Sequence, residues 1–186
     1  LTISSKKKPI SPYGKSKLLS FNLTKKYRNT HKLNTYNLVL FNSESYLRDQ
    51  KYLIAKICLA AINAKKSKKI TGFGNLDVVR EWNWCDEQCI LILKCMFTKP
   101  YDFILSNGKR YSGKQMIRYA FNYFKLDYRK YIKIEKKFYR NKDFKFKKSD
   151  FKKNIKDIDA SWRPKIFGKK IIYKLIRYYQ KKKFLN

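Results

Sequence analysis

Acidic residues, glycines and long apolar runs are scarce in this sequence. Its 186 residues contain 13 Asp and Glu against 46 Lys and Arg, which gives a formal net charge of +33. The longest apolar run, residues 57–62, is too short to cross a bilayer. The basic start, Lys6 to Lys8, precedes Pro9 and polar residues, so we expect no secretory signal there. Four cysteines are too few for a disulfide framework at this length, and they suit a reducing compartment.

Enough apolar material remains for a hydrophobic core. Hydrophobic residues make up 44% of the chain and aromatic residues 17%, which argues against disorder, and the length fits one domain. The positive charge is concentrated at the ends, with +9 in residues 1–34, +7 in residues 35–119 and +17 in residues 120–186. A surplus of this size repels itself, and it is typical of a protein that binds a polyanion.

The spacing of apolar residues predicts alternating helices and strands. Helical periodicity is found in residues 13–27, 51–64, 86–97, 113–124 and 171–179. Short segments rich in β-branched and aromatic residues predict strands at residues 35–41, 70–73 and 101–105. This alternation predicts an α/β fold.

Tyr13 and Lys17 form a Y-x-x-x-K motif in the first expected helix. Four residues apart on a helix, the two side chains lie on one face. The Lys ammonium there stabilises a phenolate, so the Tyr can act as an acid or base in hydride chemistry. Alone the motif is weak in a chain so rich in both residue types, and the alternative is an ancestral helix kept for packing.

The order of the motifs resembles the extended short-chain dehydrogenases, and specifically the GDP-mannose 4,6-dehydratase family. Residues 11–13 with Lys17 are similar to the family's S-P-Y-x-x-x-K, and residues 40–45 to its L-F-N-H-E-S. Residues 74–82 resemble G-N-L-D-x-x-R-D-W, the most specific block. The resemblance implies a partial Rossmann-like fold, the second half of the family's fold, with basic N- and C-terminal extensions. It also implies a basic segment at residues 1–12, a dehydratase-like region at residues 13–186, and remnants of a GDP-sugar site at Asn42, Arg80 and Arg140.

The family's first half has no counterpart in this sequence. That half holds the glycine-rich turn that binds NADP, and none of the six glycines here forms G-x-x-G-x-x-G. The family's active-site Ser or Thr and Glu precede the Tyr, so they are missing as well. We therefore expect no cofactor, no active catalytic residue and no enzyme, with Tyr13 and Lys17 as vestiges.

Cysteines and tryptophans have simple interpretations. Cys85, Cys89 and Cys95 fall on one expected helix, but His31 is the only histidine and no second ligand cluster is found, so we expect buried thiols and no metal. Trp82 and Trp84 could stack on bases. Trp82 matches a core position of the family, so packing is the better interpretation.

Runs of lysine recur through the chain without balancing acids, and Tyr and Phe are interleaved with cations in residues 128–131 and 138–144. Cations with aromatic platforms are typical of RNA-binding surfaces. The candidates for phosphate contacts are Lys6, Lys7, Lys8, Lys65, Lys66, Lys68, Lys69, Lys147, Lys148, Lys152, Lys153, Lys169, Lys170, Lys181, Lys182 and Lys183.

Two functions are left open. The favoured hypothesis is a non-catalytic, RNA-binding structural component of a ribonucleoprotein, in contact with rRNA and neighbouring ribosomal proteins and with no membrane. Lys, Ile, Tyr, Phe and Asn, whose codons are AT-rich, make up more than half of the chain, as is common in organellar genes, so we expect a ribosome of the mitochondrial matrix. The alternative is one subunit of a split NADP-dependent GDP-mannose 4,6-dehydratase, with a second chain carrying the missing half.

Overall fold

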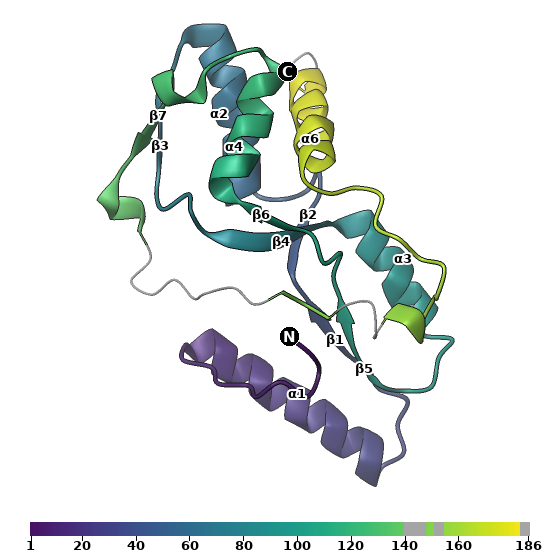
Figure 1. The fold of residues 1–186 in the computed structure, drawn as a ribbon. Helices are drawn as coiled ribbons and strands as arrows, with labels where there is room; N and C mark the ends of the chain where they lie inside the picture. The colour runs from purple at the N-terminus through teal and green to yellow at the C-terminus, as the bar shows by residue number, and fades with distance from the viewer. Residues whose placement is uncertain (140–147, 151–154, 183–186) are drawn as a thin grey trace. The chain divides into compact units, whose positions relative to one another are not determined.

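The computed structural model describes residues 1–139, 148–150 and 155–182, and their contacts divide the chain into two units (Figure 1). Unit 1 comprises Leu1–Phe41, Asp86–Gly108 and Lys147–Arg163. Unit 2 comprises Asn42–Cys85, Lys109–Phe146 and Pro164–Asn186. Because each unit is assembled from three segments, the chain passes between the units five times.

Unit 1 is built on two parallel strands. Strand β1 (Asn37–Leu40) pairs with β5 (Asp102–Leu105), with Asn37 opposite Asp102. Helix α1 (Pro12–Thr30) precedes β1, and helix α3 (Cys85–Cys95) precedes β5. Helix α1 begins where the Ser11 hydroxyl accepts a hydrogen bond from the backbone N–H of Gly14.

A buried polar cluster ties α1 to this pair of strands. Arg28 donates from Nη2 to the Asp102 carboxylate at 2.7 Å. The Asn37 amide donates to the same carboxylate oxygen and to the Phe21 carbonyl, both at 3.0 Å. Satisfied polar groups of this kind fix the helix on the strands even though no residue of α1 is itself buried.

Unit 2 holds the larger hydrophobic core. Its strands form two small sheets: β2 (Asn42–Glu44), β4 (Val79–Trp84) and β6 (Arg110–Ser112) in one, β3 (Thr71–Phe73) and β7 (Ile132–Ile134) in the other. Three helices pack on one another: α2 (Leu53–Ser67), α4 (Gly113–Tyr123) and α6 (Lys169–Lys182). Two short 3₁₀ helices, η1 (Tyr128–Lys130) and η2 (Lys136–Phe138), flank β7.

The three helices supply most of this core because each has an apolar face that the others cover. Ile57 in α2, Phe121 in α4 and Ile176 in α6 are fully buried. Helix α4 starts with a capping box, in which Ser112 and Gln115 bond to each other's backbone N–H. Figure 1 shows the three helices side by side, with their carboxyl ends at the same end of unit 2.

The five helices and three strands expected from the sequence are all confirmed within one to three residues of their predicted ends. Strands β2, β4, β6 and β7 were not expected. Trp82 and Trp84 are buried in the core, which confirms packing as their role. Within the described parts of the chain, no helix is both long and apolar enough to span a membrane.

The expectation of buried thiols is partly wrong. Cys95 is buried in α3 beside Leu91, but Cys89 is exposed and Cys85 half-buried. The buried face of α3 carries Gln88, Leu91 and Cys95, and Cys89, two residues before Leu91, points away from it.

Candidate functional site

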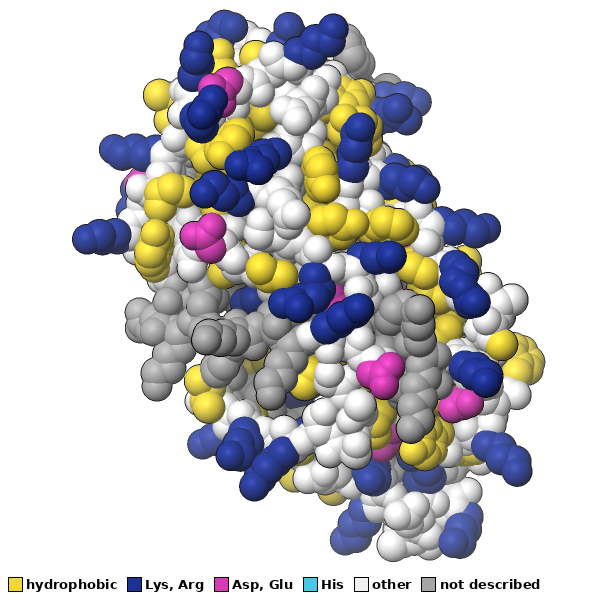
Figure 2. Space-filling model, in the orientation of Figure 1, with side chains coloured by type: hydrophobic (Ala, Val, Ile, Leu, Met, Phe, Trp, Pro, Cys, Tyr) yellow, Lys and Arg dark blue, Asp and Glu magenta, His cyan; other side chains and the backbone are white. Residues whose placement is uncertain are grey.

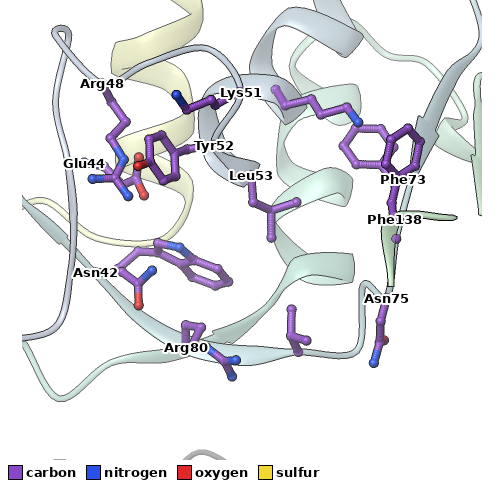
Figure 3. Close-up of a pocket in the computed structure, with 14 residues that line it drawn as sticks. Asn42, Glu44, Arg48, Lys51, Tyr52, Leu53, Phe73, Asn75, Arg80 and Phe138 are labelled. Atoms are coloured by element: carbon purple, nitrogen blue, oxygen red, sulfur yellow. The ribbon is translucent and has the colours of Figure 1, made fainter. Parts of the chain in front are cut away.

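The best-defined candidate site is a pocket of about 290 Å³ that lies entirely within unit 2 (Figure 3). It is formed where β2, the loop into α2, the end of β3, strand β4 and η2 meet. The residues that line it are Asn42, Glu44, Arg48, Lys51, Tyr52, Leu53, Lys56, Phe73, Gly74, Asn75, Val78, Arg80, Trp82 and Phe138. Two of the predicted remnants, Asn42 and Arg80, are therefore brought together, while Arg140 falls outside the described residues.

Four cations line this pocket: Arg48, Lys51, Lys56 and Arg80. The Arg48 guanidinium lies 3.7 Å from the centre of the Tyr52 ring, a cation–π contact that holds it over the aromatic face. Lys51 is paired with Asp49 at 2.9 Å on the exposed rim. Glu44 is the one acid among the described lining residues, so the lining itself has a surplus of positive charge that suits an anion.

Lys56 lies between two phenyl rings at one end of the pocket. Its ammonium is 4.9 Å from the centre of the Phe73 ring and 4.3 Å from that of Phe138. Partial burial lowers the pKa of Lys56, and the nearby Glu135 carboxylate partly opposes this. Figure 3 shows Phe73 and Phe138 grouped apart from Arg48 and Glu44, so the pocket has an aromatic end and a polar end.

Glu44 forms the floor of the polar end. Its side chain is almost completely buried, at 2% exposure. Burial raises the pKa of Glu44 to about 7, and the attraction of Arg48 opposes this only in part. The Oε2 atom has no hydrogen-bond partner among the described residues. The Glu44 carboxyl oxygen is therefore available to bind a ligand or a proton at the polar end of the pocket.

Glycine makes the aromatic end possible. A Cβ atom at Gly74 would lie 2.4 Å from the Phe138 carbonyl oxygen, which is backbone and cannot move aside cheaply. Only glycine therefore lets the end of β3 approach η2 closely enough for Phe138 to cover the pocket. Gly74 belongs to the most specific family block, but the sequence does not indicate that its neighbour in the fold is Phe138, more than 60 residues later.

Tyr13 and Lys17 lie in unit 1, along a separate groove of about 700 Å³ between α1 and β1. The Lys17 ammonium is 5.6 Å from the centre of the Tyr13 ring, as the one-turn spacing predicts. Tyr13 is 72% exposed. The pair is thus arranged on one helix face and is open to a partner.

The dinucleotide cofactor of this fold class does not fit the chain by itself. Its pyrophosphate is held by a strand, a glycine-rich turn and a helix start. Within the described residues no strand precedes α1, and the Gly14 N–H at its start is already used by the Ser11 cap. The described residues of this chain therefore do not form a site for that cofactor by themselves.

The lysines predicted to contact RNA are exposed wherever the structure describes them. Lys6 to Lys8 and Lys148 belong to unit 1; Lys65, Lys66, Lys68, Lys69, Lys169, Lys170, Lys181 and Lys182 belong to unit 2. Lys147, Lys152, Lys153 and Lys183 lie outside the described residues. In unit 2 the lysines at the carboxyl ends of α2 and α6 share one end, and Figure 2 shows Lys and Arg far outnumbering acids on the visible face. No group of potential metal ligands is found in the part of the chain that was searched.

Comparisons with known proteins identify the family to which the chain belongs. The sequence model of the family GDP-mannose 4,6 dehydratase matches residues 2–175. The chain is 26% identical over 170 residues to GDP-mannose 4,6 dehydratase 1 of Arabidopsis thaliana, covering 90% of this chain and 46% of the relative. It is 31% identical over 115 residues to the GDP-mannose 4,6-dehydratase of Sinorhizobium fredii (strain HH103), covering 61% and 33%. The chain thus spans about half or less of the curated relatives that it matches.

Solved structures give the fold. The dTDP-glucose 4,6-dehydratase of Bacillus anthracis str. Ames, in complex with NAD, superimposes with a TM-score of 0.83 at 18% identity, covering 99% of this chain and 57% of that one. The partial Rossmann-like α/β fold expected from the sequence is confirmed. The expectation that the chain is no enzyme is wrong, because the matching family and the relatives named here are dehydratases.

Proposed function

The chain belongs to the GDP-mannose 4,6-dehydratase family, and we propose that it forms the sugar-nucleotide-binding half of an NADP-dependent dehydratase. The NADP-binding half is supplied by a polypeptide region outside these 186 residues. The observation that carries this proposal is the pocket of unit 2, whose lining residues all belong to that unit and combine cations, aromatic rings and amides.

The pocket matches the parts of a nucleoside diphosphate sugar. Two phosphates require several cations, which Arg48, Lys51, Lys56 and Arg80 provide. A nucleobase stacks on aromatic rings, which the exposed Phe138 provides at the aromatic end. A volume of about 290 Å³ is at the lower end of the range for small-molecule sites, which suits a ligand that projects beyond it toward a second half.

In this proposal Tyr13 and Lys17 serve as the proton-transferring pair of the completed enzyme. When bound, a cofactor held by the other half would supply the hydride chemistry. This chain contributes the Tyr13 phenol, which exchanges a proton with the substrate, and the Lys17 ammonium, which favours the phenolate.

The decisive experiment is calorimetric titration of the purified chain with GDP-mannose, with two lysines of α2 compared. Lys56→Ala removes a cation from the pocket, whereas Lys66→Ala removes one from the exposed end of the same helix. We expect Lys56→Ala to weaken binding by about 10- to 100-fold, since a charge-assisted hydrogen bond contributes roughly 1.5–3 kcal/mol. Lys66→Ala should bind as the unaltered chain does. No detectable binding of GDP-mannose by the unaltered chain, or equal losses in both variants, would contradict the proposal.

A second proposal concerns the basic surface, and its support is the net charge of +33. We infer that it binds RNA through its lysines, chiefly those at the ends of α2 and α6. With about 6–10 phosphate contacts, affinity for an RNA hairpin should fall by about 10³–10⁵ between 50 and 200 mM salt. Replacing Lys65, Lys66, Lys68 and Lys69 by Gln should flatten the salt slope by roughly one unit per contact, whereas Lys94→Gln, which removes a partner of Asp159, should not. Salt-independent affinity would refute this. A place in a mitochondrial ribosome stays a prediction.

A further inference from the structure

The carboxyl group of Glu44, at the polar end of the unit 2 pocket, differs from three other acids of the same unit. Asp49, Asp127 and Glu135 are more exposed, and each is paired with a lysine or arginine two residues away. Glu44 is 2% exposed, and its Oε2 atom has no hydrogen-bond partner among the described residues. Burying an ionised carboxylate without a full set of partners is costly, so this position favours the neutral acid.

Arg48 lies beside Glu44 and has a donor to spare (Figure 3). Its guanidinium is stacked 3.7 Å from the centre of the Tyr52 ring, a contact that uses the flat face of the group. Its Nε atom is buried, and no described residue accepts a hydrogen bond from it. The guanidinium can therefore direct an N–H group either at the Glu44 carboxylate or at an anion in the pocket.

The groups that act on Glu44 from helices α2 and α6 do not neutralise its charge. Cys58 in α2 and Tyr179 in α6 are buried, and burial is the main cause that raises the pKa of each, with the Glu44 carboxylate adding to it. The Tyr179 hydroxyl has no hydrogen-bond partner in the part of the chain that the structure describes. Lys174 of α6 lies over the ring of Trp84, the residue opposite Glu44 in β4, at 5.2 Å from its centre. Burial raises the pKa of Glu44 itself to about 7, so its charge changes near neutral pH while the thiol and the phenol stay neutral.

The charge of Glu44 alters the electrostatics of the whole pocket. Four cations line the pocket, and Glu44 is the one acid among the described lining residues. When Glu44 is neutral, the cations act on an anion without opposition. When it is ionised, the carboxylate repels the anion and also competes for the Arg48 guanidinium.

We propose that protonation of Glu44 controls anion binding in this pocket. The pocket binds a diphosphate group when Glu44 is neutral, and it loses affinity when Glu44 ionises and attracts Arg48. This rests on the proposed function, because the ligand is the sugar nucleotide assigned to the pocket. By linkage, the bound anion favours proton binding at Glu44 to the same degree as the proton favours the anion.

The test is calorimetric titration of the chain with GDP-mannose at pH 6 and pH 8, a range in which the diphosphate does not change its charge. With a pKa of about 7, roughly nine-tenths of Glu44 is neutral at pH 6 and roughly one-tenth at pH 8, so the dissociation constant should rise about tenfold. At pH 7 each ligand should take up about half a proton, measured from the binding enthalpy in two buffers of different ionisation enthalpy. This second measurement needs no variant.

Two variants that each replace a carboxylate by an amide locate the effect. Glu44→Gln keeps the neutral form, so it should bind at both pH values as tightly as the unaltered chain does at pH 6, without proton uptake. Asp127→Asn removes a carboxylate that is paired with Arg129 outside the pocket, so the tenfold dependence should remain. A dependence that persists in Glu44→Gln would assign it to another group, such as Lys56, and overturn the proposal. Equal affinity of the unaltered chain at pH 6 and pH 8 would also overturn it.

Failure of the proposed function has a different result. If the unaltered chain does not bind GDP-mannose at pH 6, the assigned ligand is wrong, and the comparison is repeated with inorganic sulfate, whose charge is constant from pH 6 to pH 8. A tenfold weaker affinity for sulfate at pH 8, lost in Glu44→Gln, would still support control by Glu44. Absent or pH-independent sulfate binding would overturn it as well.

Discussion

Helices α1 and α2 are similar in length but differ in what covers them. Helix α2 of unit 2 buries residues on nearly every side, among them Ile54, Ile57 and Ala61. Helix α1 of unit 1 buries none, although Leu19, Leu23 and Tyr27 recur at helical spacing and stay exposed. An apolar stripe without a cover costs free energy in water. Helix α1 of unit 1 therefore exposes apolar side chains that no described residue covers, whereas the apolar side chains of α2 in unit 2 are mostly buried.

The pocket of unit 2 and the Tyr13 and Lys17 pair of unit 1 differ in the same way. The pocket with its cations and aromatic rings lies in unit 2, where Phe73 and Trp82 of its lining are buried in the core. The Tyr13 and Lys17 pair lies in unit 1, on helix α1, none of whose residues is buried. The pocket is thus lined by residues of unit 2, while Tyr13 of the tyrosine–lysine pair in unit 1 is 72% exposed.

The strongest test of unit 2 is Phe121→Ala in α4. Phe121 is fully buried, so its removal should lower the free energy of unfolding by about 3–5 kcal/mol, through lost transfer energy and the cavity left behind. Urea denaturation followed by tryptophan fluorescence measures this. The exposed neighbour Asn122→Ala should change it by less than about 0.5 kcal/mol. A loss below about 1 kcal/mol for Phe121→Ala would mean that α4 is not packed into the core of unit 2.

A smaller effect is expected from the buried carboxyl of Glu44. Because burial raises its pKa to about 7 in the folded chain, from an ordinary 4.5, the folded state binds the proton more tightly than the unfolded state. Stability from this group is therefore present below pH 4.5 and is lost as the pH rises through about 7, by roughly 2–3 kcal/mol. Glu44→Gln should remove this loss in denaturation curves at pH 5 and pH 8.

Glu135→Gln is the matched control for this change. Neighbouring Lys137 lowers the pKa of Glu135, so this carboxyl titrates at acid pH and cannot cause the loss between pH 5 and pH 8. If both variants retain the full pH dependence, Glu44 is not its source.

The smallest effect is expected on helix α1. Leu19→Ala in α1 should change the free energy of unfolding by less than about 0.5 kcal/mol, because the side chain is exposed before and after folding. The same denaturation measurement checks it. A loss above about 1.5 kcal/mol would show that this helix is covered in the chain as it stands, and the contrast with α2 would disappear.

The secondary structure of the helices could be predicted because their apolar spacing is local. Helix α4 is an example, since Ser112 and Gln115 mark its start and Ile117 and Phe121 its buried face. Strand β4, Val-Arg-Glu-Trp-Asn-Trp, is not predicted because its first four residues overlap the family block at residues 74–82, whose residues carry a motif rather than a strand period. Strands β2, β6 and β7, of three residues each, are too short to show a period.

The site was predictable only where a motif named its residues. Asn42 and Arg80 came from the family resemblance and do line the pocket. Lys56 and Phe138 could not be found, since their contact depends on the close approach of β3 to η2 at Gly74, a tertiary event. The sequence predicts one RNA-binding surface because charge can be counted along a chain. The distribution of the lysines between two units depends on the fold and cannot be counted in this way.

The five passages of the chain between the two units have a genetic consequence. Because each unit is composed of three separated segments, no single contiguous stretch of the gene encodes either one. Recombination that exchanges one continuous piece of coding sequence would bring part of one unit together with part of the other. The pocket in unit 2 and the tyrosine–lysine pair in unit 1 are thus inherited together, and mutation at individual codons is the simplest way for one to diverge while the other is kept.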